Sequence, residues 1–234
     1  MTITAETFAH RLAQLRADLV AQGRRVERVV ETAVDAVFSL DMEKATWVTE
    51  HDAVIDRSDI ELERAAVALL TDAAHASINI EAKQMRLVLM SVKVNNELER
   101  IADGGVDIAE QTPALSASPD PLPETFRVMG NSVVGVLHDA NTAFERLDAD
   151  LANMVLASDD TIDQFEAALM REAHQQLAAG AIDAERAFAM HSVAHQLERM
   201  GDHCTNIAEQ VIYVSSGAIV RHTGGRWSAP TQPD

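Results

Sequence analysis

The sequence predicts an all-α protein made of two tandem, homologous three-helix bundles related by an approximate internal two-fold. Three observations support this fold class: a thirteen-residue segment occurs twice, apolar residues recur at helical spacing, and prolines cluster between the two halves. The two copies of the segment are residues 99–111 and 198–210, which lie 99 positions apart and share seven of thirteen residues. Such a repeat constrains the architecture before any single helix is assigned. We therefore expect bundles at residues 1–111 and 124–216.

Composition agrees with helix packing and excludes several classes of protein. Hydrophobic residues make up 47% of the 234 residues but aromatic residues only 4%. The formal charge of −18 would repel a polyanion, so we expect no nucleic-acid partner. Cys204 is the single cysteine, which rules out an intrachain disulfide and favours a reducing compartment. We see neither a signal peptide nor about 18 uninterrupted apolar residues, and expect a cytoplasmic protein.

The first half predicts three helices. Apolar residues at helical spacing from Phe8 to Val37 indicate a helix over residues 6–40. Asp41 is a good N-cap for a second helix, which we expect to continue to residue 70 or beyond. Small residues at 74–77 interrupt the pattern, and a third helix follows over 78–111.

The second half repeats this plan after a linker. Four prolines between Pro113 and Pro123 predict that residues 112–123 form no helix. We expect a fourth helix at 124–156, a fifth from Ser158 or Asp159 to residue 178, and a sixth at 181–214, with Gly180 separating the last two. The tail at 217–234 has no periodicity and is expected to be flexible.

Acidic and amide side chains recur at i, i+4 and i+8 in both copies of the repeat, which places them on one stripe of each helix. The second and fifth helices carry acidic pairs in the pattern Asp-x-x-Ile-Asp. Each like-charged i,i+4 pair costs an isolated helix roughly 0.2–0.5 kcal/mol, so the doubled pattern suggests a bound cation. The residues concerned are Asp52, Asp56, Glu99, Asp103 and Asp107 in the first half, and Asp159, Asp163, Glu198, Asp202 and Asn206 in the second.

Counting residues tests whether these side chains can meet. If the second and third helices are antiparallel around a turn near Ala76, Asp56 lies 20 residues before the turn and Glu99 lies 23 after it. Around Ala179, Asp163 lies 16 residues before and Glu198 lies 19 after. At a rise of about 1.5 Å per residue, the acidic groups of facing helices come level to within about two turns. Each half therefore predicts one cluster of oxygen ligands.

Carboxylate clusters without cysteine suit hard or borderline cations such as Mg²⁺, Ca²⁺, Mn²⁺, iron or Zn²⁺. The alternative is a solvated ion-pair network that includes Arg100 and Arg199, and the spacing leaves both interpretations open. His191 and His195 could also chelate, but their counterparts in the first copy are Val92 and Asn96. We therefore interpret the two histidines as a hydrogen-bonded or partly exposed pair.

The two copies of the repeat differ in one feature that affects the first cluster. Gly104 and Gly105 follow Asp103 where the second copy has His203 and Cys204. Two glycines inside a helix cost roughly 1.6–2 kcal/mol of helix propensity relative to alanine. They either permit a close contact between helices or locally fray the helix that carries the first cluster.

The repeated segments resemble the signatures of the PhoU family. Residues 198–209, reading Glu-Arg-Met-Gly-Asp-His-Cys-Thr-Asn-Ile-Ala-Glu, are similar to the second signature, and Glu-Arg-Ile-Ala-Asp at 99–103 to the first. The resemblance covers nearly the whole chain. It implies a non-enzymatic cytosolic accessory protein that represses phosphate uptake and phosphate-starvation signalling. The implied partners are the ATPase subunit of a phosphate ABC transporter, a membrane sensor histidine kinase and a second copy of the chain.

The resemblance also implies that the ten residues of the two stripes are metal ligands, since some members hold multinuclear metal clusters there. Two other classes stay open at this stage. A di-metal carboxylate enzyme would be expected to carry Glu-x-x-His, as ferritin-like bundles do, and no glutamate here has a histidine three residues later. A purely structural dimerisation module would explain the long helices but not the doubled stripes.

Overall fold

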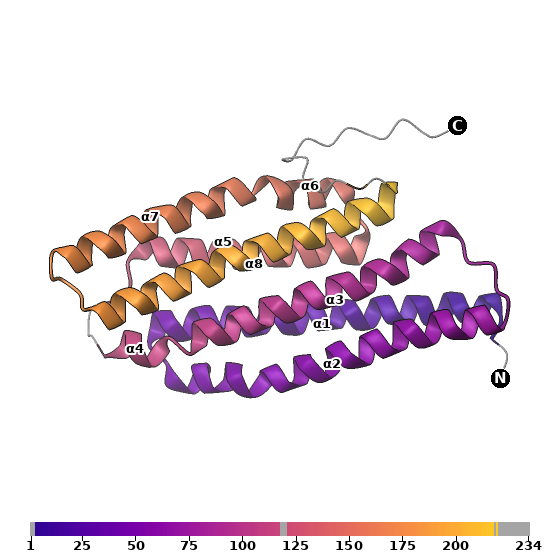
Figure 1. The fold of residues 1–234 in the computed structure, drawn as a ribbon, viewed down its shortest axis with the longest axis horizontal. Helices are drawn as coiled ribbons and strands as arrows, with labels where there is room; N and C mark the ends of the chain where they lie inside the picture. The colour runs from indigo at the N-terminus through magenta and orange to yellow at the C-terminus, as the bar shows by residue number, and fades with distance from the viewer. Residues whose placement is uncertain (1–2, 118–120, 218, 220–234) are drawn as a thin grey trace.

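The computed structural model describes residues 3–117, 121–217 and 219, and it confirms the all-α fold class. No strand occurs within these ranges. None of the helices in this part of the chain is long and apolar enough to cross a membrane. The helices, shown in Figure 1, are α1 (Ala5–Ser39), α2 (Met42–His75), α3 (Ala82–Ala109), α4 (Thr112–Ser116), α5 (Glu124–Arg146), α6 (Ala149–Ala157), α7 (Asp159–Ala178) and α8 (Ala184–Ser216).

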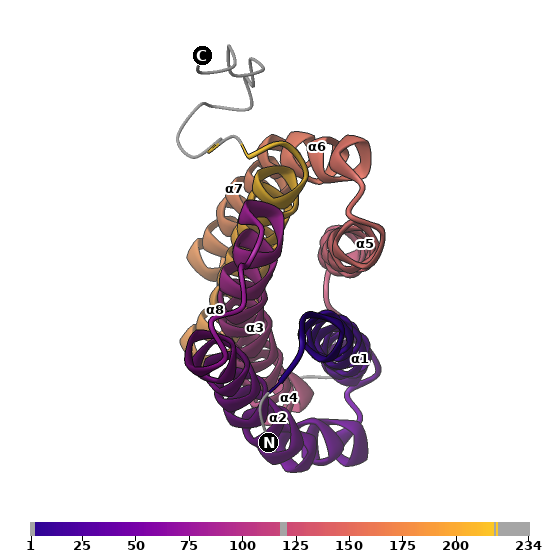
Figure 2. The ribbon, with the colours of Figure 1, turned by 90° about the vertical axis from the view of Figure 1, so that its right-hand side faces the viewer.

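Four helices form a curved layer in the order α2, α3, α8, α7, and α1 and α5 lie together on one side of it (Figure 2). The contact between α3 and α8, at the centre of the layer, is the most extensive in the structure. A single apolar core extends through both halves of the chain, because α1 packs on α2 and α3 while α5 packs on α8. Each half thus contributes a helical hairpin to the layer and one covering helix.

The predicted fourth helix at 124–156 is wrong, because the chain breaks at Leu147 and Asp148. Leu147 adopts a left-handed conformation with φ 53°, and the Asp148 carboxylate accepts hydrogen bonds from the backbone N–H groups of Asp150 and Leu151. The same arrangement ends α1, where Leu40 has φ 53° and Asp41 caps α2. The two positions are 107 residues apart. It follows that α6 and α7 together are the counterpart of α2.

The predicted helix-free linker and the third and sixth helix boundaries also need correction. Residues 112–116 form the short helix α4, which tolerates Pro113 because the first turn of a helix needs no N–H donor there. α3 begins at Ala82, after a capping box between Glu81 and Gln84. α8 begins after the N-cap Asp183. Most of the expected flexible tail lies outside the described residues, and the proposed domain boundaries stay predictions.

The internal two-fold is visible where α1 crosses α5. A Cβ atom placed on Gly23 would lie 2.6 Å from Oδ1 of Asn141, and one placed on Gly130 would lie 2.9 Å from Cγ1 of Val34. Gly130 is 107 positions after Gly23, and Asn141 is 107 positions after Val34. The crossing therefore makes the same contact twice, once from each helix, and at both places a larger residue than glycine would force the facing side chain to shift.

The α3–α8 contact has the same symmetry with the 99-residue offset. Asn206 donates a hydrogen bond to Glu97 at 3.2 Å, and Gln196 donates one to Asp107 at 2.7 Å. Gln196 is the counterpart of Glu97, and Asn206 is the counterpart of Asp107. Because the residue numbers run in opposite directions along the two helices, α3 and α8 are antiparallel.

Gly104 and Gly105 lie in the α3 surface that packs against neighbouring helices. Cβ atoms on these residues would lie 3.1 Å from Cε of Met200 and 3.2 Å from Cγ1 of Val29. Both glycines are buried, and α3 continues past them to Ala109. Of the two interpretations of this glycine pair, the structure supports the close helix contact.

A pair of identical substitutions tests the α1–α5 crossing. We expect Gly130→Leu to lower the free energy of unfolding by about 1–3 kcal/mol, because the side chain would overpack the contact with Val34. A Cβ on Gly135, on the same helix, would have no neighbour within 4 Å, so Gly135→Leu should be neutral or stabilising by up to about 1 kcal/mol. Urea unfolding of both variants measures the difference. Equal effects would contradict a tight crossing at Gly130.

Two acidic surfaces as the candidate functional site

The structure places both hairpin turns at the positions that the counting argument assumed. α2 ends at His75 with Ala76 as its C-cap, and α7 ends at Ala178 with Ala179 as its C-cap. Each hairpin therefore brings its acidic residues side by side. We call Asp52, Asp56, Asp59, Glu99, Asp103 and Asp107 the first acidic surface, and Asp159, Asp163, Glu166, Glu198 and Asp202 the second acidic surface.

The carboxylates of the first acidic surface are close enough to repel one another. Burial raises the pKa of Asp52, and the charges of Asp56 and Asp103 raise it further. Burial is also the main reason why the pKa of Glu99 is raised, followed by the charge of Asp103. The pKa of Asp103 is raised by burial and then by Asp56 and Asp107. The surface thus holds negative charge from α2 and α3 in a partly desolvated place.

Asp52 carries the clearest sign of an absent partner. Its Oδ1 atom is buried and accepts no hydrogen bond within the described structure. A buried polar atom without a partner is unfavourable, and a carboxylate oxygen especially so. A cation held between α2 and α3 would satisfy this atom and reduce the repulsion. Oxygen donors are the type that hard metal ions take, but among the described residues no three donor atoms of this surface lie within 4.8 Å of one another.

Asp59 belongs to the first acidic surface but was not among the predicted ligands. Its carboxylate accepts a hydrogen bond from Asn95 at 2.6 Å, and its charge contributes to the raised pKa of Glu99. Its counterpart 107 positions later is Glu166. The sequence did contain this signal, because both helices read Asp-x-x-Ile-Asp-x-x-[Asp/Glu].

The second acidic surface shows the same electrostatics. Burial raises the pKa of Asp159, followed by the charges of Asp202 and Asp163. The pKa of Asp202 is raised by burial and by Asp163, although His203 and Arg199 oppose the shift. The pKa of Glu198 is raised mainly by burial, and further by the charges of Asp202 and Glu166.

A histidine joins the second acidic surface. The sequence analysis considered chelation by His191 and His195 but interpreted them as a hydrogen-bonded or partly exposed pair, and His195 is both half-exposed and hydrogen-bonded to Glu166. Nδ1 of His195 lies 3.3 Å from Oε1 of Glu166 and 3.8 Å from Oε2 of Glu198. Donor atoms of these three residues all lie within 4.8 Å of one another. The three predicted aspartates of this half, Asp159, Asp163 and Asp202, belong to no such three-donor group in the part of the chain that the structure describes.

Two predicted ligands lie at the joint between the halves instead of at the centre of a surface. Asp107 accepts its hydrogen bond from Gln196, and Asn206 donates to Glu97. Glu97 also lies 2.7 Å from Nδ1 of His203. Burial would raise the pKa of Glu97, but the hydrogen bonds from His203 and Asn206 outweigh it and lower the pKa. As metal ligands, Asp107 and Asn206 stay predictions.

The arginines next to the stripes do not neutralise them. Among the described residues, Arg100 and Arg199 form no ion pair with a carboxylate of either surface. Arg199 donates instead to Oε1 of Gln196 at 3.5 Å. Its charge lowers the pKa of Asp103 and of Asp202, so it lies between the two surfaces. Arg100 also lowers the pKa of Glu99 and of Asp103, so the arginines partly offset the negative charge without pairing with a carboxylate.

The family model for the PhoU domain matches this chain twice, over residues 19–112 and 126–211. The chain belongs to the PhoU family. The two matched ranges contain both acidic surfaces, which are thus features of the repeated PhoU domain and not of a connecting segment.

Similar proteins match almost the whole chain. A phosphate-specific transport system accessory protein PhoU homolog 1 from Thermotoga maritima is 32% identical, covering 90% of this chain and 89% of its own length. A PhoU homolog from Pseudomonas putida is 33% identical, with 94% and 85% covered. The crystal structure of PhoU from Pseudomonas aeruginosa has a TM-score of 0.84 at 30% identity, covering 90% of this chain and all of that one.

The raised pKa values predict how the stability of the metal-free protein depends on pH. A carboxyl whose pKa is raised on folding stabilises the fold at low pH, and this contribution is lost as the pH rises from about 4 through the raised pKa. We therefore expect Asp52→Asn to be more stable than the wild type at pH 7 in the presence of a chelator, and the difference to shrink toward pH 4. Denaturant unfolding at several pH values measures it.

The matched control is Glu31→Gln, which removes one charge from an exposed position on α1, outside both surfaces. It reports the effect of reducing the overall charge of −18. If Asp52→Asn followed the same pH profile as this control, repulsion within the first acidic surface would not be the cause.

Proposed function

We propose that this chain is a phosphate-transport accessory protein and a negative regulator of phosphate uptake and phosphate-starvation signalling. In this role it acts without catalysis, as a cytosolic adaptor between the ATPase subunit of a phosphate ABC transporter and a sensor histidine kinase. The observation that carries the proposal is the double PhoU-domain match, together with relatives named as phosphate-specific transport system accessory proteins. The long helix faces offer the kind of surface on which protein partners dock.

The proposal includes a metal at each acidic surface. Asp52, Glu99 and Asp103 would hold it in the first half, with Asp56 and Asp59 beside them. Glu166, His195 and Glu198 would hold it in the second, with Asp159, Asp163 and Asp202 beside them. The support is the unsatisfied Oδ1 of Asp52 and the mutual repulsion of carboxylates that no arginine pairs. A bound ion would supply positive charge that joins the helices of each hairpin. Metal identity and a homodimeric state are part of the proposal.

The two surfaces differ in one type of ligand. Each surface should therefore prefer different metal ions, and an experiment can distinguish the two preferences. His195 offers an imidazole nitrogen to the second surface, whereas its counterpart Asn96 is an exposed amide. Nitrogen ligands favour Zn²⁺ and other transition metals, and oxygen-only sites suit Mg²⁺ and Ca²⁺. The second surface should therefore be the better transition-metal site.

Exchanging these two residues tests the assignment. We expect His195→Asn to lower the affinity for Zn²⁺ at one site by about tenfold or more while changing Mg²⁺ binding little, because one nitrogen ligand is lost. Asn96→His, the reciprocal change, should not lower it. Titration calorimetry and elemental analysis of chelator-treated protein measure both. Wild-type protein that binds no metal would refute the metal proposal, and an unchanged Zn²⁺ affinity in His195→Asn would remove only His195 from the ligand set.

The regulatory role has a direct genetic test. We expect deletion of the gene to raise alkaline phosphatase activity at high phosphate, because repression of phosphate-starvation genes would be lost. The double variant Glu198→Ala and Asp202→Ala should reproduce part of this effect if the second surface matters, and Glu31→Ala should not. Activity that stays repressed in the deletion strain would contradict the proposed function.

A further inference from the structure

A hollow of about 260 Å³ lies between α7 and α8, on the side of the turn that joins them. We call it the α7–α8 hollow. Its lining is mostly apolar, and none of the described residues that line it is acidic. These residues are Met170, Ala173, His174 and Leu177 from α7, and Ala184, Ala187, Phe188 and His191 from α8. None of the ligands proposed for the second acidic surface is among them, so that surface does not account for the hollow.

Two soft donor atoms meet at the α7–α8 hollow. Nδ1 of His191 lies 2.7 Å from Sδ of Met170, across the contact between the two helices. Typical bonds from a metal ion to nitrogen and to sulfur are about 2.0 and 2.3 Å long, so a single ion can bind both atoms. His174 follows Met170 by one helical turn and lines the same hollow. Both histidines are exposed, so an ion can reach them from the solvent.

The first half of the chain shows that the fold does not require these donors. The offsets between the halves are 107 residues for α2 and α7, and 99 residues for α3 and α8. The counterparts of Met170, His174 and His191 are Glu63, Val67 and Val92. The same kind of hairpin forms with valine at both histidine positions, so packing within the hairpin does not explain why the second half has histidine there.

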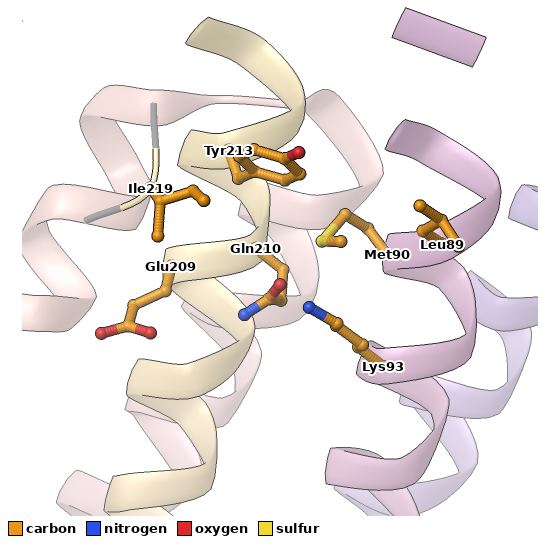
Figure 3. A pocket seen from close by; sticks show the side chains of 7 residues that line it. All are labelled: Leu89, Met90, Lys93, Glu209, Gln210, Tyr213 and Ile219. Atoms are coloured by element: carbon orange, nitrogen blue, oxygen red, sulfur yellow. The ribbon is translucent and has the colours of Figure 1, made fainter. Parts of the chain in front are cut away.

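A second hollow, shown in Figure 3, differs in its donor groups although it also contains a methionine. It lies between the beginning of α3 and the end of α8, and Met90 and Lys93 point into it from α3. Glu209, Gln210 and Tyr213 line it from α8, and no histidine is among its described lining residues. The ammonium group of Lys93 repels a cation. The α7–α8 hollow has no such charge and adds imidazole nitrogens to the thioether.

We propose that Met170, His174 and His191 form a binding site for Cu⁺. Thioether sulfur is a soft ligand that selects Cu⁺, and imidazole also suits copper. The acidic surfaces offer carboxylate oxygen, which hard cations prefer. The hairpin of α7 and α8 thus separates two classes of ion, because the second acidic surface provides carboxylates and the α7–α8 hollow provides none.

The Cu⁺ site is a neighbour of the second acidic surface but shares no ligand with it. The rings of His191 and His195 are stacked with their centroids 6.0 Å apart. His195 faces Glu166, whereas His191 faces Met170. The site therefore holds α7 and α8 together next to their turn, and it depends neither on the metals proposed above nor on phosphate signalling.

Competition with a chromophoric Cu⁺ chelator, without oxygen and in the presence of a reductant, tests the site in the full-length chain. We expect the wild type to take Cu⁺ from the chelator. Met170→Leu and His191→Val should each lower the Cu⁺ affinity at least about tenfold, because one ligand is lost. Valine is the residue that the first half has at the position of His191. Met154→Leu is the matched control, because Met154 is a 64% exposed methionine on α6, and it should leave the affinity unchanged.

Methyl NMR locates the ion. Ag⁺ has the same charge and softness as Cu⁺ and no redox chemistry under these conditions. In protein with labelled methionine methyl groups, Ag⁺ should shift the signal of Met170, which is assigned by its absence in Met170→Leu. The signals of Met90 and Met154 should stay in place.

Three results would overturn the proposal. The first is wild-type protein that takes no Cu⁺ from the chelator, or Met170→Leu protein that takes it equally well. The second is Cu⁺ binding that disappears in Cys204→Ala but persists in Met170→Leu, because the buried thiol would then be the ligand. The third is a Zn²⁺ affinity of the second acidic surface that falls together with the Cu⁺ affinity in Met170→Leu, because the two sites would then not be separate.

Discussion

The direct contact between α3 and α8 is the constraint on which the rest of the arrangement depends. These two helices carry the repeated thirteen-residue segment, and they pack antiparallel at the centre of the four-helix layer. A glycine makes this close packing possible, because a Cβ on Gly104 of α3 would lie 3.1 Å from Cε of Met200 on α8. Because each central helix has its hairpin partner on its outer side, both acidic surfaces belong to the same layer and flank one joint.

Apolar packing holds the repelling carboxylates in place. The isoleucine of each Asp-x-x-Ile-Asp pattern, Ile55 or Ile162, is almost completely buried and anchors its helix to the core. The aspartates three residues before it and one residue after it are thereby fixed beside the buried side of the helix, although their charges oppose the arrangement. Burial of isoleucine contributes roughly 1.5–3 kcal/mol, which exceeds the few tenths of a kcal/mol that a like-charged pair costs on a helix. The apolar packing can therefore hold these carboxylates in place without a bound ion, and the proposed ion would add to an arrangement that already exists.

The sequence predicted the features that depend on periodicity and on the repeat. The helical stripes, both hairpin turns and the two-fold could be read from spacing alone. The break at Leu147 could not, because leucine favours helices and the left-handed residue is stabilised by the cap that follows it. The contact between His195 and Glu166 could not be predicted for a different reason. Its distance to Glu166 depends on how α7 and α8 pack, and the spacing within one helix contains no such information.

The two halves share a scaffold but have diverged where they meet. In the first half Gly104 leaves room for Met200, whereas its counterpart His203 lies against Glu97 at 2.7 Å. His203 directly follows Asp202 of the second acidic surface, and Glu97 lies two residues before Glu99 of the first. The joint therefore links residues adjacent to both surfaces through one contact that the two-fold does not repeat. Any rearrangement of one hairpin that moved His203 would act on α3 directly, so the asymmetry gives the repeated fold a physical connection between its two candidate sites.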